Sequence, residues 1–155
     1  MPDMDLTQNE ADALIKMKKI SENNEVYIYP DTGGSIRIPL ISKDKKESFF
    51  LDITRGKIDL LKGTYQNRAR KVISLLRLDF GGQPHRNPDG TEVPSPHMHI
   101  YIEGYGDKWA FNMSEISKKY NLTFSNINNL SITLDEFMAY CNIINPPSIE
   151  RSLFT

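Results

Sequence analysis

The chain has 155 residues, of which 39% are hydrophobic and 25% charged, and its formal net charge at pH 7 is −1. This composition is typical of a globular protein with a core, and the balanced charge excludes a general attraction to nucleic acid, so any such binding needs a local basic patch. No apolar run approaches 18 residues and the acidic start Met1–Asp5 has no apolar signal segment, so we expect neither a membrane span nor secretion. The single cysteine, Cys141, excludes an internal disulfide and favours the cytoplasm. We expect one domain over residues 1–155.

The first part of the chain predicts a helix followed by strands. A capping box of Thr7 and Glu10 begins the helix, and alternating apolar residues mark the strands. The elements predicted here are a helix from Thr7 to about residue 21, a hairpin of strands 26–30 and 36–40 around the turn 31–34, and a second strand pair, 49–53 with 57–61.

The second part predicts more strands and then helices. The elements predicted here are helix or strand over 65–70, strand over 72–80, an irregular segment over 81–96, strands 97–103 and 108–113 around the turn 104–106, a short helix over 114–120, and a helix opened by a capping box at Thr133 and Glu136 and carrying Cys141. The fold class is therefore α+β: a mostly antiparallel β-sheet with an N-terminal helix and C-terminal helices packed on it.

All three histidines of the chain lie between residues 85 and 99. Histidine is the side chain most easily used for proton transfer or metal binding near neutral pH, so this segment is the first candidate for function. Residues two apart in a strand point to the same side, so His97, His99 and Tyr101 are predicted to share one face. If strand 72–80 pairs with this strand, Arg77 and Asp79 lie on the same face.

Two chemistries fit this face. In the first, His97 and His99 act on RNA as base and acid: one deprotonates a 2′-hydroxyl, the other protonates the leaving 5′-oxygen, and Arg77 or Arg86 stabilises the transition state. In the second, the two histidines bind a divalent metal with Asp79 or a third imidazole, and the metal activates water. The structural alternative is that these residues form only the solvated side of a strand.

A basic cluster precedes strand 72–80. Arg68, Arg70 and Lys71 are candidates for contacts with substrate phosphates, although such a cluster is commonly just a solvated surface.

The histidine segment also carries an extended motif. From His85 to Ala110 it has H-R-N-P-D-G, a short gap, and P-H-x-H-x-Y-x-E-G-Y-G-D-K-W-A. This signature resembles that of a family of small bacterial proteins of unknown function.

More distantly, the chain is similar to the core of TumE-type toxins of bacterial toxin–antitoxin pairs. The matching positions are Arg77, Asp79, His85, and the histidine pair His97 and His99 of the P-H-x-H element. This resemblance implies a small cytoplasmic endoribonuclease toxin, encoded beside its antitoxin, with these five residues lining its site.

The leading hypothesis is therefore a metal-independent RNA-cleaving toxin without a cofactor, whose partners are its RNA substrate and a cognate antitoxin protein. The residues expected in catalysis are His97, His99, His85, Arg77, Asp79 and Tyr101, and those expected to bind substrate are Arg86, Arg68, Arg70 and Lys71. Two rival hypotheses are a non-enzymatic protein of phages or mobile elements that inhibits a host defence system, and a metal-dependent hydrolase.

Overall fold

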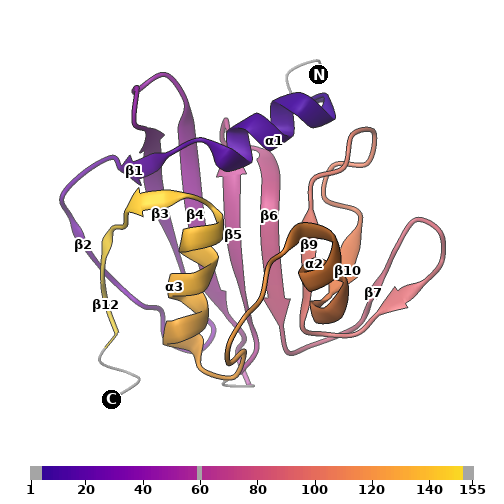
Figure 1. Cartoon of the computed structure of the whole chain (residues 1–155). Helices are drawn as coiled ribbons and strands as arrows, with labels where there is room; N and C mark the ends of the chain where they lie inside the picture. The colour runs from indigo at the N-terminus through magenta and orange to yellow at the C-terminus, as the bar shows by residue number, and fades with distance from the viewer. Residues whose placement is uncertain (1–4, 59–60, 152–155) are drawn as a thin grey trace.

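The computed structural model describes residues 5–58 and 61–151, and a large eight-stranded sheet forms its centre (Figure 1). The strand order is β10-β9-β6-β5-β4-β3-β1-β11, and neighbouring strands are antiparallel except for β1 with β11. The strands are β1 Lys19–Ser21, β3 Ser35–Ser42, β4 Ser48–Arg55, β5 Gly63–Ala69, β6 Ile73–Phe80, β9 His97–Ile100, β10 Ala110–Asn112 and β11 Ile143–Asn145.

Three helices in the described residues lie on one side of this sheet (Figure 1). They are α1 Gln8–Lys16, α2 Met113–Tyr120 and α3 Leu130–Tyr140. Thr7 and Asn112 begin α1 and α2 with capping boxes, and the side chain of Asn129 caps α3, so each helix starts where a side chain accepts an unpaired backbone N–H. The predicted α+β class is confirmed. None of the described helices is long and apolar enough to cross a membrane.

Side-chain alternation gives the sheet two different faces. Leu51 and Ile53 of β4 are buried in the same core cluster as residues of α3, whereas Asp52 between them is half-buried on the opposite face. The same alternation places Arg77 and Asp79 of β6 on the face turned away from the helices. One face therefore forms the core, and the other carries polar side chains.

The predicted hairpin of strands 26–30 and 36–40 is wrong. The strand β2, Val26–Ile28, pairs in parallel with β12, Ser148–Glu150, in a separate two-stranded sheet. The strand β3 has β4 on one side and β1 on the other, so neither of its edges is left for β2.

The predicted strand over residues 57–61 is also wrong where the structure describes it. Lys57 and Ile58 lie in a bend and Leu61 lies in a turn, while residues 59–60 lie outside the described residues. The antiparallel partner of β4 is instead β5. The segment 65–70, for which the sequence left helix and strand open, is therefore mostly strand.

Two helix ends differ from their predicted positions. Helix α1 ends at Lys16, because the chain turns there to begin β1 at Lys19. Helix α3 starts one turn before the predicted capping box at Thr133, because the Asn129 side chain accepts from the N–H of Ile132. Cys141 follows this helix as its C-cap and is buried.

The segment 81–96 contains a small hairpin next to the histidine strand. It consists of β7, His85–Arg86, and β8, Glu92–Val93. Asn87 ties it to β10, because its Nδ2 donates to the carbonyl of Ala110 at 3.0 Å and its Oδ1 accepts from the N–H of Ala110 at 2.8 Å. This attachment brings His85 beside the strand that carries the other histidines.

Candidate functional site

Strands β6 and β9 bring the predicted polar residues together. In their antiparallel register, Arg77 lies opposite His99 and Asp79 lies opposite His97. The pairing on which the predicted shared face depended is present, and these four side chains share one face of the sheet at one end of β6.

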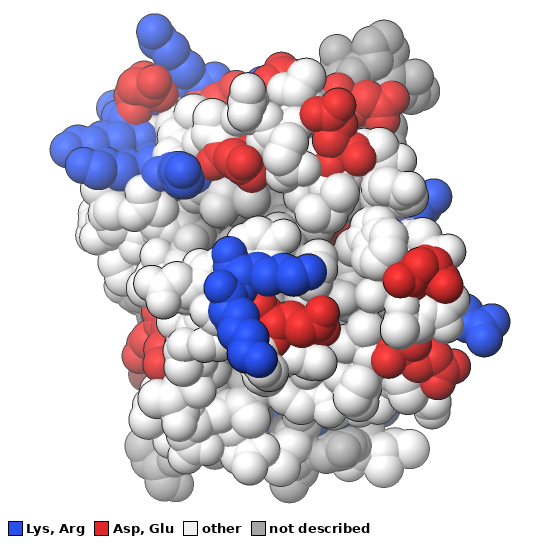
Figure 2. All heavy atoms as spheres, turned by 45° about the vertical axis from the view of Figure 1, so that its right-hand side comes forward, with Lys and Arg blue, Asp and Glu red and all other residues white. Residues whose placement is uncertain are grey.

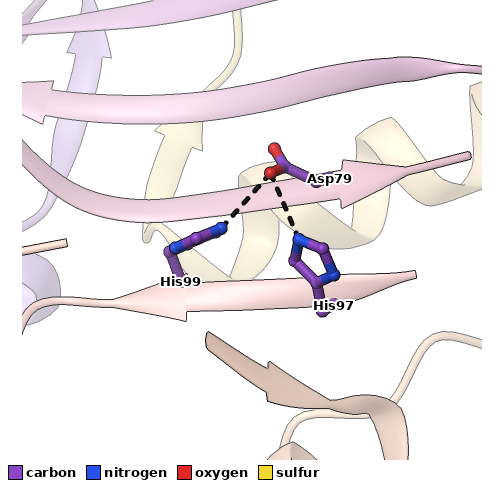
Figure 3. A group of neighbouring side chains, drawn as sticks. All are labelled: Asp79, His97 and His99. Atoms are coloured by element: carbon purple, nitrogen blue, oxygen red, sulfur yellow. Dashed lines mark ion pairs between the residues drawn. The ribbon is translucent and has the colours of Figure 1, made fainter. Parts of the chain in front are cut away.

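The two histidines converge on one carboxylate oxygen (Figure 3). Oδ2 of Asp79 lies 3.3 Å from Nε2 of His97 and 3.3 Å from Nε2 of His99. The histidine side chains are 2% and 1% exposed, whereas the Asp79 side chain is 22% exposed. Solvent therefore reaches the cluster through the carboxylate rather than through the imidazoles.

The partners of His99 define its neutral tautomer. Its Nδ1 lies 2.8 Å from the carbonyl oxygen of Asp107, which can only accept, so Nδ1 carries a proton and donates it. The guanidinium of Arg77 can only donate, and its Nη2 lies 2.9 Å from Nε2 of His99. Nε2 of His99 is consequently an acceptor with its lone pair directed into the cluster.

His97 is oriented in the same way. Its Nδ1 lies 3.3 Å from the carbonyl oxygen of Pro94 and donates to it, which leaves Nε2 facing Asp79. A backbone carbonyl behind Nδ1 is the arrangement that commonly orients metal-binding histidines, because it fixes the tautomer and the ring plane.

Asp79 is ionised in this setting. Burial disfavours its charged form, but His97, His99 and the Arg77 guanidinium beside it together hold the pKa of the carboxyl well below its usual range. The hydroxyl of Thr64 also donates to Oδ1 at 3.1 Å. The cluster therefore contains a full negative charge at neutral pH.

Arg77 connects the cluster to a second carboxylate. Its Nε lies 3.2 Å from Oδ1 of Asp79 and its Nη1 lies 3.1 Å from Oδ2 of Asp107. The guanidinium is thus held by two carboxylates in addition to its contact with His99.

His85 completes the group of imidazoles. Its ring centroid lies 4.5 Å from that of His99 and 6.0 Å from that of His97. Its Nε2 donates to the carbonyl of Lys108 at 2.7 Å. The sequence analysis placed His85 with the other two, and the structure brings all three together.

The Asp79, His97 and His99 ligand atoms have a spacing suited to a metal ion. All three lie within 4.8 Å of one another. Two ligands bound at about 2.1 Å to one ion lie roughly 3.0–3.4 Å apart, and the two distances from Asp79 Oδ2 are both 3.3 Å. The two imidazole nitrogens lie within 4.8 Å of each other, and a separation beyond about 3.4 Å would have to shorten on a bound ion. Two histidines and one carboxylate form a known ligand set for divalent transition metals.

Tyr101 does not belong to the site, and its predicted place on the histidine face is wrong. Strand β9 ends at Ile100, so the alternation does not continue. The Tyr101 hydroxyl donates to the carbonyl of Leu6 at 3.0 Å and accepts from the N–H of Leu6 at 2.8 Å. The side chain is buried and anchors the chain just before α1.

The predicted phosphate-binding cluster lies elsewhere. Arg70 and Lys71 form the turn between β5 and β6, at the end of β6 roughly 20 Å along the strand from Asp79. Arg68 is paired with Asp52 through contacts of 2.6 and 2.9 Å, and Arg70 is paired with Glu47. The structure does not bring these three residues to the histidines.

The other predicted substrate residue, Arg86, is exposed in β7 opposite Glu92. On the face drawn in Figure 2, Lys and Arg side chains stand in separate groups with acidic side chains close by. Among the described residues, this face presents no continuous basic strip.

Sequence reasoning missed Asp107, which both accepts from His99 and binds Arg77. Its position in the G-D-K-W part of the motif was the available signal. It was missed because the residue follows a turn, where strand alternation no longer predicts the direction of a side chain.

Together, the fold and the site define an α+β protein with helices on one sheet face and a His–His–Asp centre at one edge of the other. The chain belongs to a family of unknown function, DUF6978, which matches residues 6–143. The expectation of an uncharacterised family is therefore confirmed, and the similarity to TumE-type toxins stays a prediction. No curated protein and no solved structure matches the chain.

Proposed function

We propose that the protein is a divalent-metal-dependent hydrolase of phosphodiesters, with Asp79, His97 and His99 as the metal ligands. The observation that carries the proposal is the convergence of two imidazole Nε2 atoms on one ionised carboxylate oxygen at 3.3 Å. An imidazole with its proton on Nδ1 presents a lone pair at Nε2, so the two imidazoles and the carboxylate can offer three ligand atoms to one cation. A divalent ion bound there would be held by all three side chains.

The residues around the ligands suit hydrolysis. A metal ion lowers the pKa of bound water, so that hydroxide is available at neutral pH. Hydrolysis of a phosphodiester would consume one water for each bond cleaved: the water oxygen would bond to phosphorus as the bond to the leaving sugar oxygen breaks, and that sugar oxygen would take up a proton. In this proposal Arg77 binds the phosphate charge, because its guanidinium contacts His99, and His85 carries the proton, because its ring packs on His99.

RNA is the proposed substrate, and a cognate antitoxin is the proposed partner. Both follow from the similarity of Arg77, Asp79, His85, His97 and His99 to the TumE-type core. The protein would then act on cellular RNA and be held inactive by a protein encoded beside it.

A second candidate is the metal-independent endoribonuclease of the leading sequence hypothesis. The contact of 2.9 Å between Arg77 Nη2 and His99 Nε2 favours it, because the guanidinium places a positive charge where a metal ion would otherwise be needed. In this mechanism His97 and His99 would transfer the protons themselves.

One pair of measurements separates the two candidates. Calorimetric titration with Mn²⁺ and Zn²⁺ and cleavage of a mixed RNA pool with and without EDTA are applied to the wild type, Asp79→Asn and Asp52→Asn. Asp52 is a matched control, because it is a half-buried aspartate on the same sheet face that is also paired with an arginine. We expect stoichiometric binding and EDTA-sensitive cleavage in the wild type and Asp52→Asn, and neither in Asp79→Asn.

Other results would reject the proposal. Undiminished cleavage in EDTA would establish the metal-independent candidate instead. Metal binding without cleavage of any RNA or DNA would exclude a phosphodiester hydrolase. If Asp79→Asn and Asp52→Asn both keep their metal binding, Asp79 is not a ligand.

A further inference from the structure

A pocket of about 210 Å³ opens directly beside Asp79. Its lining is rich in glycine and includes one lysine. The lining residues are Thr54, Arg55, Gly56, Lys62, Gly63, Thr64, Asp79, Gly81, Gly82 and Gln83. Because Asp79 belongs to both the pocket and the histidine cluster, a molecule in the pocket contacts the candidate metal ligand that is most accessible to solvent.

Three of these glycines cradle the side chain of Lys62. A Cβ atom at Gly56 would lie 3.0 Å from Cβ of Lys62, one at Gly81 would lie 2.9 Å from its Cα, and one at Gly82 would lie 3.0 Å from its Cε. The contact at Gly81 is shorter than real Cβ atoms make and the other two are unusually tight, so larger residues there would displace the lysine. The cradle follows Lys62 from its backbone to its terminal carbons and thereby directs the ammonium group.

The backbone of the cradle is also suited to close approach by a ligand. Gly81 and Gly82 have φ values of +68° and +94°, which L-residues with side chains rarely adopt. The Ser95 hydroxyl donates to the carbonyl of Gly81 at 3.0 Å and holds this segment in place. Successive glycines let a bound group contact the main chain without a side chain in between.

The ammonium group of Lys62 has no ion-pair partner among the residues that the structure describes. A second hollow of about 430 Å³ lies along the same side chain and is lined by Lys57, Ile58, Lys62 and Gly82. The two hollows share Lys62 and Gly82, and only the smaller one includes Asp79. Unpaired ammonium groups beside glycine-rich backbone are typical of phosphate recognition.

We infer that the glycine-cradled Lys62 pocket is a phosphate subsite, which holds a phosphate group of the substrate chain adjacent to the one cleaved at the histidine cluster. The inference rests on the proposed function for the identity of the substrate, but the binding of phosphate in this pocket can be tested without cleavage. Lys62 was outside the sequence prediction, because two of the three glycines of the cradle, Gly81 and Gly82, are distant from it along the chain.

The test is a titration with inorganic phosphate, followed by the backbone amide signals of Gly81 and Gly82 in ¹H–¹⁵N spectra. The protein is treated with EDTA, so that metal ions do not contribute. We expect saturable shifts of both signals in the wild type and binding about ten-fold or more weaker in Lys62→Met, which keeps the apolar stem but lacks the charge. Lys62→Arg restores the charge and is expected to recover most of the affinity.

Lys118→Met in α2 is the matched control, because it removes an exposed lysine far from the pocket, and it is expected to bind as the wild type does. Equal phosphate affinity of the wild type and Lys62→Met would overturn the inference. So would shifts confined to other parts of the protein.

A parallel titration with a 2′-deoxydinucleotide tests for an internal phosphodiester. We expect the same two glycine signals to shift, again dependent on Lys62. Shifts with inorganic phosphate alone would assign the pocket to a terminal phosphate and reject a subsite within a chain.

The outcomes are independent of those for the metal site. Metal binding at Asp79 without phosphate binding at Lys62 would overturn the subsite and leave the proposed function standing. Phosphate binding at Lys62 without metal binding at Asp79 would overturn the proposed function and leave the phosphate-binding pocket standing.

Discussion

At the scale of single residues, Lys19 shows how a buried charge is used for structure. Its Nζ donates to the carbonyls of Ile15 at 2.9 Å, Met17 at 3.0 Å and Cys141 at 2.6 Å. The first two lie at the end of α1 and the third at the end of α3, where helix dipoles favour a positive charge. The lysine thus joins two helix C-termini beneath the sheet, which explains why a charge is retained in the core.

This arrangement predicts a pH-dependent stability. Burial lowers the pKa of Lys19 from 10.5 to about 8, so above pH 8 the folded protein releases a proton that the unfolded chain keeps until about pH 10.5. The unfolded state then binds more protons, and the free energy of unfolding rises with pH in this window. We expect the wild type to gain about 1 kcal/mol relative to Lys19→Met between pH 8 and 9. Urea denaturation at each pH measures it.

The comparison of the two proteins ends at pH 9 because a second group titrates above it. Burial raises the pKa of Cys141 to about 12, so the free energy of unfolding falls above the ordinary thiol pKa of 9. Lys18→Met, an exposed neighbour, serves as the control and is expected to follow the wild type. A difference between wild type and Lys19→Met that stays flat or shrinks from pH 8 to 9 would contradict the prediction.

At the scale of elements, the β7–β8 hairpin depends on one side chain for its position. Asn87 makes both of its hydrogen bonds to the backbone of Ala110 in β10, and it is buried. The hairpin carries His85, whose ring packs on His99. The sequence analysis identified the N-P-D-G segment as a turn, whereas its tie to β10 follows from the tertiary structure.

Asn87→Ala is therefore expected to loosen the hairpin. Two backbone groups of Ala110 lose their partner, which costs about 1–3 kcal/mol in the free energy of unfolding. We also expect the imidazole signals of His85 to broaden or shift towards those of an exposed histidine, as measured by NMR. Glu92→Gln, at an exposed position of the same hairpin, is the control. It should change the free energy of unfolding by no more than about 0.5 kcal/mol and leave the His85 signals unshifted. Equal behaviour of the two variants would show that the hairpin is held by other contacts.

At the scale of the whole molecule, the fold keeps the core and the site on opposite faces of one sheet. The helices bury the face that includes Leu51 and Leu78, while the histidine cluster lies at the end of β6 on the other face. The polar groups of the candidate site can therefore be changed without removing the main apolar contacts of the core.

Expression in bacterial cells tests the toxin hypothesis at this scale. We expect the wild type to arrest growth and His99→Gln to abolish the arrest, because the glutamine has no imidazole lone pair to offer. Growth curves measure the effect, and the thermal midpoint of the purified variant is expected to stay within a few degrees of the wild type. Growth arrest by a folded His99→Gln variant would rule out a catalytic role for His99, and gradual loss across all three histidine variants would favour the inhibitor of a host defence system.

The sequence by itself determined the features that depend on local patterns. Strand alternation predicted that Arg77, Asp79, His97 and His99 share a face, and the capping box at Thr7 predicted the start of α1. Both follow from periodicity and from hydrogen bonds within a few residues, which a sequence displays directly.

The tertiary structure decided which elements become neighbours. It gave β2 the distant β12 as its partner, turned Tyr101 towards Leu6, and placed Lys62 beside glycines about twenty residues away. These choices depend on the edges and surfaces left free once the central strands have paired, and pairing between distant segments is not contained in the local pattern of either one.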